Sequence, residues 1–195
     1  MAQTIVTGPT IEPVTLQEAK DHLRITETDI GSEDTLLLGF IAAARRHCES
    51  VHNRAYLEQT WNLILDDFPD EDYIRVPLPP LVSVAHVKYY GTGGTASTMT
   101  AANYYEDTDS EPGRVYLGYG ESWPSATLRP AAGVEVQFTA GYGSVASAVP
   151  AEIKQAIMLL VGHMYERRED TDIKEVVSVP FGVYELLGVD RVVPV

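Results

Sequence analysis

Residues 41–65, IAAARRHCESVHNRAYLEQTWNLIL, decide the fold class, because the spacing of apolar side chains changes within this one stretch. In its first half the apolar residues are three or four positions apart, at Ile41, Ala44 and Cys48. In its second half they are two positions apart, at Trp61, Leu63 and Leu65. The first spacing is that of one helix face and the second that of one strand face. The chain therefore combines helices with β-structure.

Apolar residues with helical spacing predict three helices, over residues 15–23, 32–52 and 150–168. The first begins with the capping-box pattern Thr15-Leu16-Gln17-Glu18. The second begins near Ser32-Glu33-Asp34, where two acids complement the helix dipole. The third begins at Pro150, a residue that suits the first helical position.

The middle of the chain predicts a small antiparallel β unit, with strand patterns over residues 61–65, 73–76, 82–89, 114–117 and 134–138. Turn signals such as Gly91-Thr92-Gly93-Gly94 separate them, and no helical pattern lies between them. Because parallel strands need helical connections, antiparallel pairing is expected. The predicted fold is α+β: a helical bundle of N-terminal helices and a long C-terminal helix, with an inserted antiparallel β subdomain and an extended C-terminal tail.

Four segments follow from these patterns: N-terminal helices in 1–55, the inserted β subdomain in 56–148, the third helix in 149–170 and the tail in 171–195. The tail from Val176 onward is apolar but too short to build a core of its own. We therefore expect a partner or a neighbouring subunit to cover it.

Charge narrows the possible ligands. The 195 residues include 28 acids and 14 bases, a net charge of −14, and residues 56–148 alone hold 12 of the acids against 4 bases. Nucleic-acid affinity comes mostly from Lys and Arg that release counterions, so tight general DNA binding is excluded. The same negative charge disfavours anionic membranes, and no apolar run approaches the roughly 18 residues of a spanning helix.

The beginning of the sequence has no basic segment followed by an apolar one, so no export signal is expected. The single cysteine, Cys48, cannot form an intrachain disulfide, which fits a reducing compartment. Cys48 and His52 are four apart and could reach one metal, but Cys48 also continues the apolar helix face. A core position is the favoured interpretation, and no metal site is predicted.

No pattern of catalytic residues stands out. The glycines at 91–94 lack the Lys-Ser/Thr of a phosphate loop, and the acid pairs Asp66-Asp67 and Glu106-Asp107 lie in turns, where carboxylates are normally solvated. Neither catalysis nor a cofactor is predicted. Tyrosines gather in the β unit, at Tyr89, Tyr90, Tyr104, Tyr105, Tyr116 and Tyr119. Stacking on sugars is therefore an open alternative to packing on a sheet or at an interface.

Several stretches in a fixed order run through nearly the whole chain: 13–24, 41–46, 59–61, 77–84, 138–143, 149–157 and 179–183. They include Pro13-Val14-Thr15-Leu16-Gln17-Glu18, Pro77-Leu78-Pro79-Pro80 and Val179-Pro180-Phe181-Gly182. Together they resemble the head–tail connector (adaptor) proteins of tailed bacteriophages and gene transfer agents. Our prediction departs from the simplest members, which are nearly all helical, in its β unit.

The resemblance implies a non-enzymatic virion protein of the neck, assembled in the bacterial host cytoplasm. Such proteins form a homo-oligomeric ring, a dodecamer in the particle, beneath the portal protein. The ring extends the DNA channel, through which DNA passes without specific binding, and it offers a platform for a stopper or tail-terminator protein. Its helical part makes the subunit contacts, and its C-terminal segment reaches the portal.

Two sets of residues become candidate sites under this resemblance. The predicted portal-binding residues of the tail are Val179, Pro180, Phe181, Val183, Leu186, Leu187, Val192 and Val193. The acids predicted to face the DNA channel, where they would repel the duplex, are Asp66, Asp67, Asp70 and Asp72. Two alternatives stay open: a carbohydrate-binding or hydrolytic phage structural protein that uses the tyrosines, and a different neck component such as a stopper or tail terminator.

Overall fold

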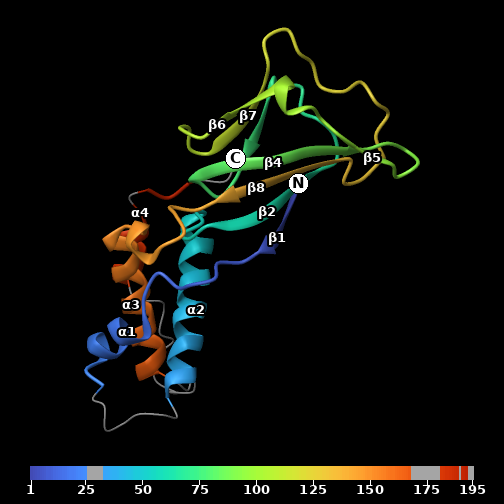
Figure 1. Cartoon of the computed structure of the whole chain (residues 1–195). Coiled ribbons are helices and arrows are strands. Elements are labelled where there is room, and N and C mark those ends of the chain that lie inside the picture. Colours follow the sequence, from blue (N-terminus) through green and yellow to red (C-terminus); the bar gives the residue numbers. More distant parts are fainter. Residues whose placement is uncertain (26–32, 168–180, 189, 193–195) are drawn as a thin grey trace. The chain divides into compact units, whose positions relative to one another are not determined.

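The structure is a computed structural model that describes residues 1–25, 33–167, 181–188 and 190–192 (Figure 1). Its strands are β1 Ala2–Thr7, β2 Gln59–Leu65, β3 Tyr73–Val76, β4 Leu81–Tyr90, β5 Ala96–Thr98, β6 Tyr104–Asp107, β7 Gly113–Leu117 and β8 Val134–Ala140. Its α-helices are α1 Leu16–Leu23, α2 Asp34–His52, α3 Ala151–Glu166 and α4 Phe181–Gly188. The predicted α+β class is confirmed.

Two compact units make up the chain, and each draws on separate stretches of sequence. The β unit contains Met1–Pro9 and Arg54–Ser144. The helical unit contains Thr10–Asn53 and Val145–Val193.

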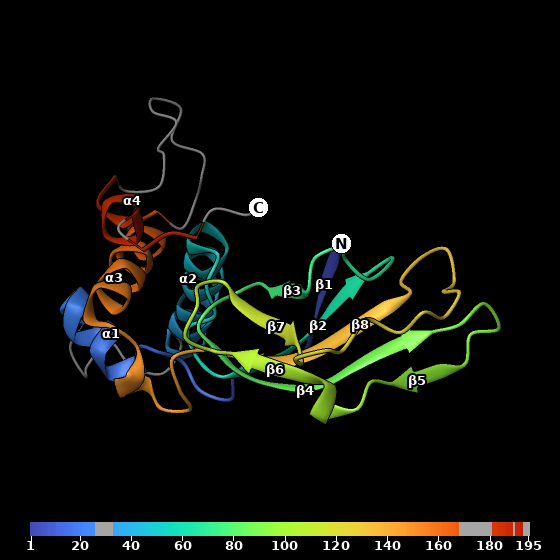
Figure 2. The same ribbon diagram turned by 90° about the horizontal axis from the view of Figure 1, so that it is seen from above.

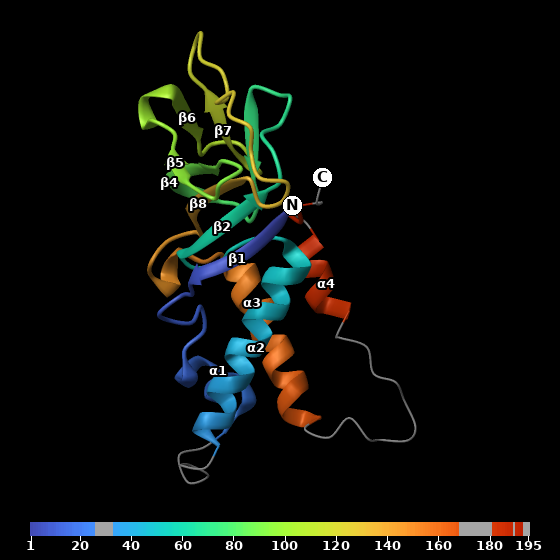
Figure 3. The ribbon, with the colours of Figure 1, turned by 90° about the vertical axis from the view of Figure 1, so that its right-hand side faces the viewer.

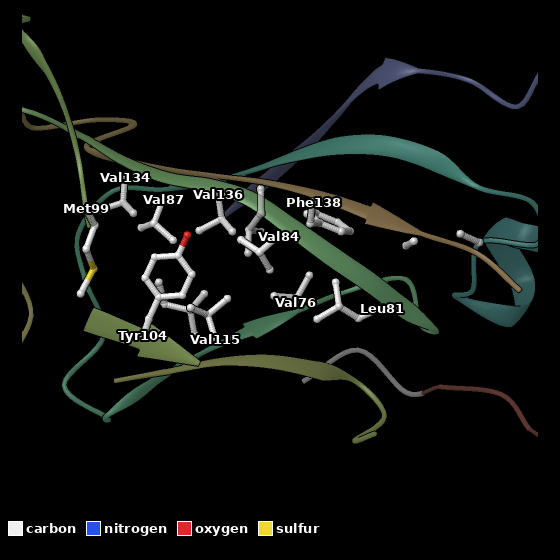
Figure 4. Packing of buried hydrophobic residues seen from close by; sticks show 14 residues of the cluster. Val76, Leu81, Val84, Val87, Met99, Tyr104, Val115, Val134, Val136 and Phe138 are labelled. Atoms are coloured by element: carbon white, nitrogen blue, oxygen red, sulfur yellow. The ribbon is translucent and has the colours of Figure 1, made fainter. Parts of the chain in front are cut away.

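The β unit consists of two antiparallel sheets. One has five strands in the order β1-β2-β8-β4-β5, and the other has three in the order β3-β7-β6 (Figure 2). Figure 4 shows that side chains of both sheets meet in a shared core, among them Val136 and Phe138 of β8 and Val115 of β7. The alternation that predicted a strand at 134–138 therefore reflects real burial, because β8 buries every second residue.

β4 departs from strict alternation. Val84 and Val87 are buried and Val82 is exposed, although Val82 is two residues from Val84. The reason is a change of register against β8 between Leu81 and Ser83 and again between Val84 and His86. Each irregularity shifts which side chains face the core, as β-bulges do.

In the helical unit α2 and α3 pack against each other, and both also contact α1 and α4 (Figure 3). α1 begins as predicted: the Thr15 hydroxyl accepts a hydrogen bond from the N–H of Glu18 at 3.1 Å, and the Glu18 carboxylate accepts one from the N–H of Thr15 at 2.7 Å. α2 buries the predicted residues Leu37, Ile41, Ala44 and Cys48. α3 buries Ile153, Ala156, Ile157, Leu160 and Val161.

Candidate partner-binding surfaces

The predicted portal-binding residues differ in their surroundings. Val179, Pro180 and Val193 lie outside the described residues, and Phe181 is the first residue of α4. Val183 and Leu187 are fully buried, whereas Leu186 and Val192 are half-buried. Because α4 packs against α3 and α2, part of the apolar surface of the tail is covered by the chain itself.

The segment after α4 is hydrogen-bonded to the C-terminal end of α2. The N–H of Val192 donates to the carbonyl of His52 at 3.2 Å, and the Asn53 side-chain amide donates to the carbonyl of Val192 at 2.7 Å. Asn53 itself has the left-handed conformation, with φ 56°, that commonly ends a helix. Tyr184 of α4 is exposed, with 43% of its surface accessible.

The predicted channel acids are all exposed and belong to the β2–β3 connection. Two of them have local structural roles: Asp66 accepts a hydrogen bond from the N–H of Ala132 at 2.9 Å, and Asp67 accepts one from the N–H of Phe68 at 2.8 Å. The connection is held to the β unit by the Phe68 ring, which stacks on Trp123 with centroids 5.1 Å apart. Asp70 and Asp72 are thus carboxylates on an ordered, solvent-facing loop.

Tyrosines occupy both faces of the three-stranded sheet. On the outer face Tyr73, Tyr116 and Tyr105 are in register on β3, β7 and β6. The Tyr73 and Tyr116 centroids are 5.0 Å apart, and the Arg114 guanidinium lies 5.6 and 5.4 Å from them. Tyr104 is instead buried in the core. Tyr105 and Tyr116 therefore share the outer face of this sheet with Tyr73, whereas Tyr104 belongs to the core.

The edge strands of the five-stranded sheet, β1 and β5, are open to solvent. Every residue of both strands is exposed, and Ile5 and Val6 of β1 each expose 51% of their surface. Both strands lie in stretches without any Asp, Glu, Lys or Arg, residues 1–11 and 89–105. β4 continues beyond β5, and there the Glu106 carboxylate accepts a hydrogen bond from the N–H of Val84 at 2.9 Å. Neither edge strand is among the strands that the sequence predicts.

The described residues contain no group of three or more His, Cys, Asp or Glu side chains arranged to hold a metal ion. Cys48 is fully buried, and burial raises the pKa of its thiol to about 12, so the thiol stays protonated at neutral pH. In the same described part of the chain, none of the helices combines the length and apolar character needed to cross a membrane.

Comparison with known proteins gives consistent matches. The sequence model described as phage gp6-like head-tail connector protein matches residues 13–112. A chain in the neck of an empty GTA particle computed with C6 symmetry has a TM-score of 0.83 and 29% identity, covering 100% of this chain and 97% of that chain. A chain of the virion of a native gene transfer agent (GTA) particle scores 0.82 at 28% identity, with the same coverage. A chain from the neck of a native GTA particle computed with C12 symmetry has a TM-score of 0.80 and 27% identity, covering 100% of this chain and 97% of that chain. No curated protein matches the chain.

Proposed function

The chain belongs to the phage gp6-like head-tail connector family, and on that basis we propose that it is the adaptor that joins the portal of a DNA-filled head to the stopper or tail terminator. The observation that carries this proposal is the structural match to a GTA neck chain, at a TM-score of 0.83 over 97% of that chain. The match includes the β unit as well as the helices, because it covers 100% of this chain. The proposed role is assembly in the virion neck rather than catalysis.

The proposed adaptor is a ring of identical copies. The C6 and C12 symmetries of the matched neck particles support this arrangement, because rotational symmetry of that kind places copies around one axis. The direct test is to mix the purified chain with the portal protein of its own particle and to image the mixture by electron microscopy. Rings stacked on one end of the portal are expected, and bare portals in the presence of excess chain would contradict the proposal.

The proposed contact with the portal uses the C-terminal segment. Deleting residues 179–195 also removes Val183 and Leu187, which the helical unit buries, so that truncation is a poor test alone. A sharper variant is Tyr184→Glu, because Tyr184 is exposed on α4. Its matched control is Tyr119→Glu, which changes a fully exposed tyrosine of the β unit. We expect only the first variant to lose portal binding in a pull-down; equal binding by both would contradict the assignment to α4.

The proposed channel function predicts that acids of the β2–β3 connection keep the DNA duplex from adhering, because like charges repel and no counterions are released. Asp70 and Asp72 are the suitable residues to change, since Asp66 and Asp67 also accept backbone hydrogen bonds. Particles with Asp70→Asn and Asp72→Asn should eject DNA more slowly. The control Glu58→Gln with Glu121→Gln removes two exposed charges elsewhere, and identical ejection in both variants would leave solubility as the role of the acids.

A further inference from the structure

We infer that neighbouring copies of this chain join through the edges of their five-stranded sheets, with β1 of one copy pairing with β5 of the next. This inference rests on the proposed ring, and it adds a contact between sheet edges to the subunit contacts that the family resemblance assigns to the helical part. β1 and β5 are the two ends of the strand order β1-β2-β8-β4-β5, so each copy offers one edge on either side. The partner is therefore a second copy of this chain.

β1 lacks the features that usually protect an edge strand. An edge presents a row of unpaired N–H and C=O groups, and proteins normally guard it with charged residues, proline or bulges. Residues 2–7, AQTIVT, contain no charge and no proline. Four of them are β-branched, including the exposed pair Ile5 and Val6. The one irregularity is a register shift between Ile5 and Thr7, which leaves Ala2–Ile5 regular.

The distribution of charge favours these edges over other contacts between copies. Each chain carries a net charge of −14, so two copies repel each other over most of their surfaces. The stretches that contain the edge strands, 1–11 and 89–105, bear no charged side chain. Main-chain pairing at these edges therefore brings copies together where the repulsion is smallest, while the acids remain in solvent.

The topology sets the direction of the proposed pairing. Four successive antiparallel pairings separate β1 from β5, so the two strands run in the same direction within one copy. A rotation about an axis along the strands keeps that direction, and β1 would pair with β5 of the next copy in parallel. This head-to-tail contact uses two different surfaces and can close a ring. A two-fold dimer would instead pair β1 with β1.

Disulfide trapping tests the contact. The full chain is prepared with Thr4→Cys and Ser97→Cys, and in a second version with Gln3→Cys and Ser97→Cys to sample the adjacent register. Within one chain the two positions are four strand spacings apart, roughly 19 Å, which is beyond the reach of a disulfide. After mild oxidation at high chain concentration, a non-reducing gel should show a ladder of covalent multimers. Each variant with only one of the introduced cysteines should give monomers only, because the native Cys48 is buried.

The control pair Thr4→Cys with Ser122→Cys keeps the β1 cysteine and moves the second one to an exposed loop. We expect at least tenfold less multimer from it. Dimers from Thr4→Cys alone would overturn the inference in favour of β1–β1 pairing. Portal-bound rings in the microscope without any ladder from either edge pair would overturn the inference and leave the adaptor proposal intact. If neither portal-bound rings nor a ladder of covalent multimers appears, both the sheet-edge inference and the adaptor proposal are overturned.

Discussion

Arg45 shows how a single buried cation organises the helical unit. Its guanidinium binds Glu12 at 2.7 Å and Glu49 at 2.7 Å, and only 8% of the residue is exposed. Burial alone would lower the pKa of Arg45, but the hydrogen bond to Glu12 and the charge of Glu49 raise it instead. The ion pair with Glu12 ties the segment before α1 to the middle of α2.

Arg45→Ala should therefore destabilise the helical unit by about 3 kcal/mol, because it removes the buried cation that two carboxylates bind. Arg46→Ala is the matched control: it removes the same charge from the neighbouring, exposed position and should change stability by less than about 0.5 kcal/mol. Urea unfolding followed by circular dichroism measures both. Equal effects of the two variants would show that net charge, not the buried pairs, is responsible.

Cys48 gives a second prediction at the residue scale. Because burial raises the pKa of the thiol to about 12 and no surface is accessible, the folded chain should resist thiol reagents at pH 8. Addition of denaturant should release one reactive thiol per chain, measured by the absorbance of a chromogenic disulfide reagent. Rapid labelling without denaturant would mean that α2 exposes this face in solution.

At the scale of single elements, the start of α1 depends on the ionised form of Glu18. The pKa of Glu18 is lowered by the hydrogen bond from the backbone N–H of Thr15 and then by the one from its hydroxyl. A lowered pKa in the folded state means that the stabilisation is present above the ordinary value of 4.5 and is lost as the pH falls through the lowered value.

Glu18→Gln should accordingly be less stable than the parent chain at pH 7, and the difference should shrink as the pH is lowered below about 4. Thr15→Ala, which removes the hydroxyl cap, should cost about 1 kcal/mol at pH 7. Unfolding titrations at a series of pH values provide the measurement. A difference between Glu18→Gln and the parent that stays constant down to acid pH would refute the role of the charge.

Two glycines in different elements should respond in opposite directions to the same change. At Gly141 φ is +138°, and an added Cβ would lie 2.4 Å from the backbone carbon of Leu57. Gly39 is exposed within α2, with no atom near an added Cβ. Gly141→Ala should destabilise the chain by more than about 1 kcal/mol, whereas Gly39→Ala should stabilise it by about 0.5–1 kcal/mol. Thermal unfolding distinguishes the two, and a stable Gly141→Ala chain would contradict the close approach.

The elements that could be predicted from the sequence are those that bury one face. α1, α2, α3, β2, β3, β4, β7 and β8 all have apolar residues at the spacing of the element, so their existence was predictable. β1 was not, because all six of its residues are exposed and burial therefore imposes no alternation. α4 was missed because two of its eight residues are glycines, which disfavour a helix, although Pro180 before it is a helix-start signal.

At the scale of the whole molecule, the candidate surfaces were only partly predictable. The sequence predicts that a partner or a neighbouring subunit covers the apolar tail at 171–195, yet Val183 and Leu187 are covered by the chain's own helices. Sequence shows that a side chain is apolar but not which surface covers it. The portal contact therefore remains a prediction. Its physical basis is the exposed side of α4, and not a need to bury the apolar side chains of the tail.

The net charge of −14 leads to a prediction about assembly. Repulsion between copies is screened over about 10 Å at 0.1 M salt and over about 3 Å at 1 M. Raising sodium chloride from 50 to 500 mM should therefore strengthen self-association, as measured by sedimentation velocity. A circular dichroism spectrum that is unchanged across this range is the control for folding. Weaker association at high salt would show that attractive ion pairs, rather than uncharged surfaces, hold the copies together.

The interleaving of the two units also constrains the order in which the chain can fold during synthesis. β1 is made first, but its neighbour β2 follows more than fifty residues later and the central strand β8 only at residues 134–140. α1 and α2 likewise wait for α3, which is complete at residue 166. At the usual rate of about 5–20 residues per second, β1 spends several seconds on the ribosome without a partner. We assign β1 to the contact between finished copies. The same strand is therefore exposed in every copy that is still being synthesised, and the cell must manage that exposure.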